Sequence, residues 1–97
     1  MASAFMYSEH FSRRLWSRYG IRMSTQISAE ILAQLLAAAQ PGCPLVTPAR
    51  FLRPDAGAPS RGWWQVQVQG RPVVVVVELL PAPGLVTALP AREVRHG

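Results

Sequence analysis

Hydrophobic residues in the first part of the chain recur with the period of an α-helix. In residues 9–19 the positions i, i+4 and i+8 are apolar and aromatic: Phe11, Leu15 and Tyr19, with Trp16 beside them. Ser8 suits a helix N-cap and Gly20 suits the left-handed residue that ends a helix. The pattern predicts an amphipathic helix of about three turns over residues 9–19.

A second helical pattern follows, with Ser24 and Ser28 as alternative N-caps and Pro41-Gly42 as the stop. We expect its apolar stripe to face the core and its outer face, mostly Ala and Gln, to have a structural role. The stripe consists of Ile27, Ile31, Leu32, Leu35, Leu36 and Ala39.

The period changes to that of strands in the second half of the chain. Residues 45–52 predict a short strand that Pro44 and Pro48 confine to a sheet edge or to an irregular start, and residues 53–62 predict a loop. Residues 63–68 alternate, so Trp64, Val66 and Val68 share one face and Trp63, Gln65 and Gln67 the other. Gln69-Gly70 predicts a tight hairpin turn.

The remaining chain predicts two more strands. Residues 73–77 are apolar on both faces, as in a central strand, and residues 85–89 form the last strand after a turn. We expect one buried sheet face to include Val74 and Val76 together with Trp64, Val66 and Val68, packed against Leu15, Leu32 and Leu36. Val77 should also be buried.

Together these elements predict an α+β fold, with two N-terminal helices packed on one face of a three- to four-stranded antiparallel sheet. The length of 97 residues suits a single domain, 1–97. Residues 1–7 are expected to form an N-terminal arm and residues 91–97 a flexible tail.

Composition limits the functions that fit. Ten basic residues, all Arg, stand against five acids, for a net charge of +5. A GC-rich genome explains the absence of Lys but not the excess of base, so an acidic or nucleic-acid partner is favoured. Cys43 is the only cysteine, which excludes an intramolecular disulfide and a cysteine-based metal site. We expect no metal and no cofactor.

Neither a membrane-spanning segment nor a signal peptide is predicted from the sequence. The apolar run at residues 73–80 is too short to span a bilayer, and the first residues lack the basic start and apolar run of a signal peptide. We therefore expect a cytoplasmic protein without a membrane partner. The sequence leaves the oligomeric state open.

Ionisable groups converge at one place, the polar face of the first predicted helix. We expect this face to bind a partner, together with Trp63, whose exposure on the sheet is an alternative to its being covered by the N-terminal arm or the long loop. The candidate partner-binding residues are His10, Arg13, Arg14, Ser17, Arg18, Arg22 and Trp63.

One motif resembles a known group of proteins. It is His10-Phe11-x-x-Arg14-x-x-x-Arg18-Tyr19-Gly20-Ile21, followed by a Ser-capped helix, a Val-rich hairpin and a closing Val86-Thr87-Ala88-Leu89-Pro90. This resembles small phage and prophage proteins related to the RelE and barnase-like ribonuclease toxins. The resemblance implies a helix with His and Arg, a four-stranded antiparallel sheet and a last strand near a Thr.

If this is a ribonuclease, the resemblance implies metal-independent RNA cleavage. His10, Arg14, Arg18 and Thr87 would then supply acid–base groups and stabilise the charged phosphorane. Against this stand the absence of Lys, the single acid Glu9 on that helix face, and the position of the other histidine, His96, in the tail. These absences favour a protein without catalytic activity, and the sequence leaves the ribonuclease open as an alternative.

Three functions stay open, and we favour the first. It is a protein-binding module that uses the Arg face and exposed aromatic residues against an acidic protein, which a phage origin would make a host enzyme or defence complex that the protein inhibits. The second is RNA or DNA binding by a basic stripe, and the third is the RelE-like ribonuclease. The stripe would add Arg50, Arg53, Arg61 and Arg71, near the strand ends, to the arginines of the helix.

Overall fold

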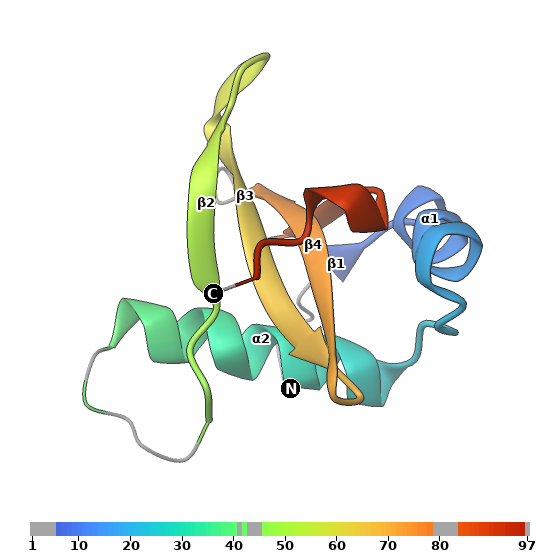
Figure 1. The fold of residues 1–97 in the computed structure, drawn as a ribbon, viewed down its shortest axis with the longest axis horizontal. Coiled ribbons are helices and arrows are strands. Elements are labelled where there is room, and N and C mark those ends of the chain that lie inside the picture. The colour runs from blue at the N-terminus through green and yellow to red at the C-terminus, as the bar shows by residue number, and fades with distance from the viewer. Residues whose placement is uncertain (1–5, 41, 43–45, 79–83, 97) are drawn as a thin grey trace.

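The computed structural model describes residues 6–40, 42, 46–78 and 84–96. Two helices precede four antiparallel strands, which confirms the α+β fold (Figure 1). The elements are β1 (Met6–Tyr7), α1 (Glu9–Tyr19), α2 (Thr25–Ala39), β2 (Arg50–Asp55), β3 (Ala58–Val68), β4 (Arg71–Glu78), β5 (Gly84–Ala88) and the 3₁₀ turn η1 (Ala91–Glu93).

The sheet has the strand order β1-β5-β4-β3-β2. Strand β1 pairs in parallel with β5, so two residues of the expected N-terminal arm form a sheet edge. A strand of two residues has no readable period, which is why the sequence did not predict it. The other expected arm residues, 1–5, lie outside the described residues.

The helix boundaries follow from local capping. The Ser8 hydroxyl accepts the Phe11 N–H at 3.1 Å, and Gly20, at φ 66°, ends α1 in the left-handed conformation. These contacts confirm the predicted span of the first helix. For α2 the Ser24 hydroxyl accepts the Ile27 N–H at 3.2 Å, which decides between the two predicted caps. The predicted stop at Pro41 lies outside the described residues.

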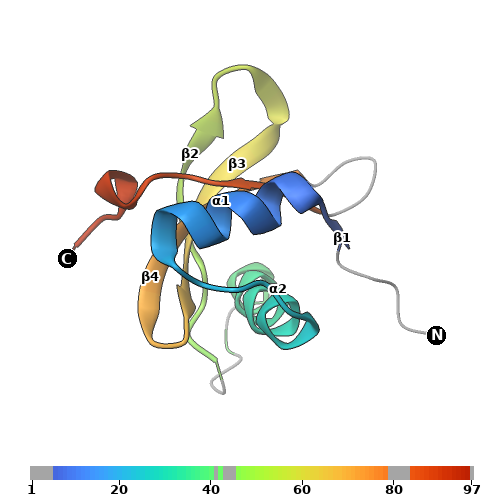
Figure 2. The ribbon, with the colours of Figure 1, turned by 90° about the vertical axis from the view of Figure 1, so that its right-hand side faces the viewer.

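Both helices lie on the same side of the sheet, which we call the helix face (Figure 2). Helix α1 lies along β5 and α2 lies against β3. The core between these layers consists of Phe11, Leu15, Tyr19, Ile21, Ile27, Ile31, Ala49, Val66, Val68, Val73, Val75, Val77, Leu85 and Ala88.

The register corrects the predicted buried face. Trp64 stands opposite Val75 and Val66 opposite Val73, so the odd-numbered valines of β4 point to the helix face. Val74 and Val76 point to the opposite face, and their predicted place was wrong. A strand that is apolar on both faces has no alternation from which its register can be read.

Val74 and Val76 are buried nonetheless. The segment after β5 crosses the opposite face in front of β4 (Figure 1), where η1 contacts that strand. The Gln65 side chain donates to the Arg95 carbonyl at 2.8 Å and accepts the Arg95 N–H at 2.7 Å. Arg95, in the segment that the sequence suggested as a flexible tail, is thus hydrogen bonded to β3.

Helix α2 is rotated relative to the predicted stripe. Leu36, expected in the core, is 51% exposed, whereas Gln34 is 3% exposed. Leu32 and Leu35 are only partly buried against the core. The buried residues of this helix are Ile27, Ser28, Ile31, Gln34 and Ala37, and two of them are polar.

The prediction of a loop at residues 53–62 is wrong. This segment is the outer half of a long hairpin, in which β2 ends at Asp55, a turn follows at Ala56-Gly57, and β3 begins at Ala58. Pro54 is tolerated because β2 is the edge of the sheet and its pairing is irregular there. The expected edge strand therefore begins five residues later than predicted, and Leu45 lies outside the described residues.

The hairpin turn between β3 and β4 is confirmed. Gln69 and Gly70 have φ values of 52° and 77°, the positive angles that a two-residue hairpin turn requires. Within the described part of the chain, no helix is long and apolar enough to span a membrane.

Candidate functional site

Helix α1 is fixed to the sheet at its C-terminal end. Arg18 Nη1 donates to the Ala88 carbonyl at 2.8 Å, and the Tyr19 hydroxyl accepts the Val74 N–H at 3.2 Å. Arg71 Nη1 donates to the Tyr19 carbonyl at 2.8 Å. These bonds hold α1 in place over β5 (Figure 2) and leave its outer surface facing solvent.

The predicted partner-binding residues of α1 fall into two groups. His10, Arg13, Arg14 and Ser17 are exposed on the outer surface, which we call the α1 surface. Arg18 is half-buried, and its guanidinium holds the end of β5. Its position three turns along the helix gave no sign of this role, because Ala88 is far away in the sequence.

Arg13 and Glu9 form an ion pair of 3.1 Å on the α1 surface. Both side chains are at least three-quarters exposed, so the pair contributes only about 0.3–0.5 kcal/mol. A partner's carboxylate can therefore replace Glu9 at little cost.

Trp16 is the surface residue that the sequence interpretation missed. It was placed beside the apolar stripe, yet 56% of it is exposed. The helical period explains this, since Trp16 is rotated by about 100° from the buried Leu15. The Arg22 guanidinium lies 5.7 Å from the centre of the Trp16 ring.

Trp16 forms one wall of an open groove of about 330 Å³ between α1 and the connection to α2. The groove is lined by Ser12, Trp16, Arg22 and Met23. Met23 is half-buried and packs against the core, so it is anchored below the groove. Arg22, predicted to extend the basic helix face, lies at this groove.

The other two candidates lie on the sheet face away from the helices. Thr87 stands opposite Val76, and Val76 stands opposite Trp63, so these side chains form one row across β5, β4 and β3. The structure therefore places Thr87 on the opposite face of the sheet from α1, which carries His10 and Arg14. The four residues suggested for RNA cleavage are divided between two layers.

Trp63 is half-buried by its own hairpin. The Arg53 guanidinium lies 4.8 Å from the ring centre, and Trp63 Nε1 donates to the Asp55 carboxylate at 3.1 Å. Next to it, Arg61 pairs with Glu78 at 2.7 Å. The long loop expected to cover Trp63 is in fact β2 with its turn.

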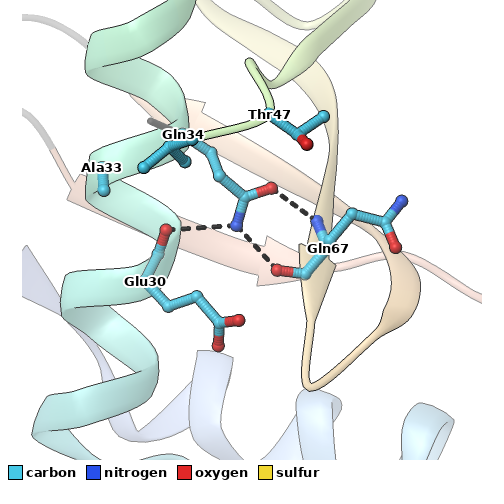
Figure 3. A pocket seen from close by; sticks show the side chains of 6 residues that line it. Glu30, Ala33, Gln34, Thr47 and Gln67 are labelled. Carbon is cyan, nitrogen blue, oxygen red and sulfur yellow. Dashed lines mark hydrogen bonds between the residues drawn. The ribbon is translucent and has the colours of Figure 1, made fainter. Parts of the chain in front are cut away.

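A second depression, between α2 and β3, surrounds the buried Gln34 (Figure 3). The Gln34 amide makes two hydrogen bonds to the main chain of Gln67, at 2.6 and 2.7 Å, and a third to the Glu30 carbonyl at 3.1 Å. Among the described lining residues only Glu30 is ionisable, and its carboxylate accepts the Gln69 N–H at 3.4 Å. These contacts give the depression a structural role.

Within the described residues no group of three or more His, Cys, Asp or Glu could hold a metal ion. No known family, curated protein or solved structure matches the chain. The resemblance to RelE-related toxins therefore rests on the sequence motif and stays a prediction.

Proposed function

We propose that this protein is a binding module that docks an acidic protein partner on the α1 surface and the adjoining groove. The observation that carries the proposal is the exposure of Trp16 on a helix whose outer residues include Arg13 and Arg14. Tryptophan and arginine are enriched among the residues that dominate interface energies. An exposed Trp on a fixed helix supports a protein interface.

Charge supports an acidic partner. Residues 8–24 contain four arginines and one acid, Glu9. Such a surface attracts acidic proteins and accelerates their association. Because α1 is tied to β4 and β5, little conformational freedom is lost when it binds. If the phage-protein resemblance holds, the partner would be a host enzyme or defence complex that the protein inhibits.

The test is partner capture with two matched variants. Tagged wild-type protein, Trp16→Ala with Arg14→Glu on the α1 surface, and Arg53→Glu on the opposite sheet face are incubated with nuclease-treated host extract. Captured proteins are quantified, and affinity is then measured with the purified partner. We expect the α1 variant to lose at least about 30-fold in affinity, the loss that corresponds to about 2 kcal/mol at a hot spot.

The control should bind within about twofold of the wild type. Capture that survives in the α1 variant but is lost in the Arg53→Glu control would contradict the proposal. Circular dichroism of each variant checks that the fold is retained.

A second function, nucleic-acid binding, is favoured by the register of the hairpin. Arg53 and Arg61 lie on the same sheet face as Trp63. The segment that crosses this face contains two more arginines, Arg92 and Arg95. An aromatic ring among arginines suits single-stranded nucleic acid. Binding of a labelled RNA oligonucleotide, with a log–log salt slope of about −0.7 per phosphate and loss on Arg53→Glu, would support this function over the first.

A further inference from the structure

The groove beside Trp16 is lined by two apolar and two polar side chains. Trp16 and Met23 supply the apolar surface, while the Ser12 hydroxyl and the Arg22 guanidinium supply the polar groups. The Ser12 hydroxyl is already directed to the Ser8 carbonyl, at 3.4 Å. The groove has a volume of about 330 Å³, which lies at the lower limit of ligand sites, so the groove suits a side chain better than a cofactor.

The two apolar side chains of the groove suit contact with an inserted apolar side chain. Met23 is unbranched and has a polarizable sulfur, which lets a methionine fit anchors of different shape. Trp16 offers a large apolar surface that is more than half exposed before binding. Covering this surface with an apolar side chain removes it from water, which is favourable.

Arg22, which lines the groove, and Arg13, on the neighbouring α1 surface, are held only by weak, exposed contacts. Arg22 rests over the Trp16 ring at 5.7 Å, and Arg13 pairs with the exposed Glu9. A guanidinium binds a carboxylate through two parallel hydrogen bonds, which are stronger than either contact. Acidic residues next to an inserted apolar side chain would therefore recruit both arginines.

We propose that this groove is the anchor site for an acidic peptide segment of the partner. A large apolar side chain of the segment lies against Trp16 and Met23, and flanking Asp or Glu residues pair with Arg22 and Arg13. This inference rests on the proposed function, because it places the interface on α1, and it adds the chemical class of the bound segment.

The excess of arginine favours an acidic occupant. A basic segment is repelled by the four arginines of residues 8–24. The exposed Glu9 carboxylate next to Arg13 opposes any anionic occupant, but it is one acid against these four bases. A nucleotide base can also stack on an exposed Trp, so a short RNA is the competing probe in the test.

The test uses a random library of 12-residue peptides displayed on phage and selected on the immobilised wild-type protein, with counter-selection on Trp16→Ala. Enriched peptides are synthesised with a fluorescent label, and their binding is measured by anisotropy. We expect a large apolar residue flanked by at least two acids. Affinity should fall at least 10-fold on Trp16→Ala and at least threefold on Arg22→Gln.

The matched control is Arg53→Gln, which removes the other arginine that lies over a tryptophan, on the far face of the sheet. It should leave peptide affinity within twofold. Because Trp16 and Arg22 are exposed, their variants should fold, and circular dichroism checks this. Peptides that lack acids, or that bind Trp16→Ala as well as the wild type, would overturn the inference.

A 12-nucleotide RNA is the competing probe. If it binds the wild type more tightly than the selected peptides and depends on Trp16, the groove is a base-stacking site and the peptide inference is wrong. If the α1 variant loses the native partner but selection yields no acidic–apolar peptides, this inference fails while the proposed function stands. If peptides behave as expected but partner capture is unchanged, the proposed function fails and the peptide site stands.

Discussion

Gln34 on α2 makes both hydrogen bonds to the main chain of Gln67 that a neighbouring strand would make, one from its amide nitrogen at 2.6 Å and one to its amide oxygen at 2.7 Å. Strand β2 pairs with β3 only as far as Arg50 and Gln65, so α2 closes the next part of this edge. The Ala49 N–H, just before β2, donates to the main-chain carbonyl of Gln34 at 2.9 Å and so also joins this segment to α2. A buried glutamine thereby satisfies a strand edge inside the fold.

Replacing Gln34 should destabilise the protein. In Gln34→Leu the Gln67 N–H and carbonyl lose their partners next to the core, which costs about 1–3 kcal/mol. Urea denaturation followed by fluorescence measures the change. The control Gln67→Ala keeps the main chain and removes an exposed side chain, so it should change the free energy of unfolding by less than about 0.5 kcal/mol. Equal effects of the two variants would contradict this role.

Replacing Arg18 should destabilise the protein more than replacing Arg14, although the two residues are one turn apart on the same helix. Arg18→Ala removes the bond to the Ala88 carbonyl and should cost about 1–2 kcal/mol. Arg14 is exposed, so Arg14→Ala should stay within about 0.5 kcal/mol of the wild type. Thermal unfolding of both variants checks this order, and a larger loss for Arg14→Ala would refute it.

Burial in the core raises the pKa of the Tyr19 phenol above its ordinary value of about 10, and the hydrogen bond from Val74 opposes this only in part. The folded protein therefore keeps the Tyr19 proton where the unfolded chain loses it. The stabilising contribution of the protonated Tyr19 phenol is fully present below about pH 10, and it is lost as the pH rises above that value. The chain has no Lys, so few other groups titrate there.

The measurement for Tyr19 is the free energy of unfolding between pH 8 and 11.5, for the wild type and Tyr19→Phe. The variant is expected to be less stable near pH 8, because it no longer accepts the Val74 N–H. Its stability should fall less steeply above pH 10. Parallel pH profiles of the two proteins would show that Tyr19 does not cause the alkaline loss.

Truncations on α2 should report its true orientation. Ile31 is fully buried, so Ile31→Ala should cost about 2–5 kcal/mol. Leu36 is 51% exposed, so Leu36→Ala should cost less than about 1 kcal/mol. Chemical denaturation distinguishes these values, and a loss of 2 kcal/mol or more for Leu36→Ala would mean that the helix is rotated as the sequence pattern suggested.

The sequence by itself determined the features that depend on local physics. The 3.6-residue period and the two end caps predicted α1, and the requirement for positive φ predicted the turn at Gln69-Gly70. Alternation along residues 63–68 separated the two faces of β3. These features are decided within a few residues of the chain, so they can be read without knowledge of distant neighbours.

Only the tertiary structure decided the register of β4, the rotation of α2 and the extension of the hairpin. A run of valines has no polar side from which its orientation can be predicted. Gln34 is polar and would be expected at the surface, but its hydrogen bonds to the edge of β3 keep it buried. Pro54 suggested a loop because the edge pairing that tolerates it depends on the other strands, and Gly57 lies in the turn between β2 and β3.

The candidate site divides in the same way. The sequence found the cluster of His10, Arg13 and Arg14, because helical spacing alone places them on one side. It could not show that Arg18 binds Ala88, seventy residues away, or that Trp16 is exposed beside Arg22. Long-range contacts assign each side chain to the core or to solvent, and they arise only when the helices pack on the sheet.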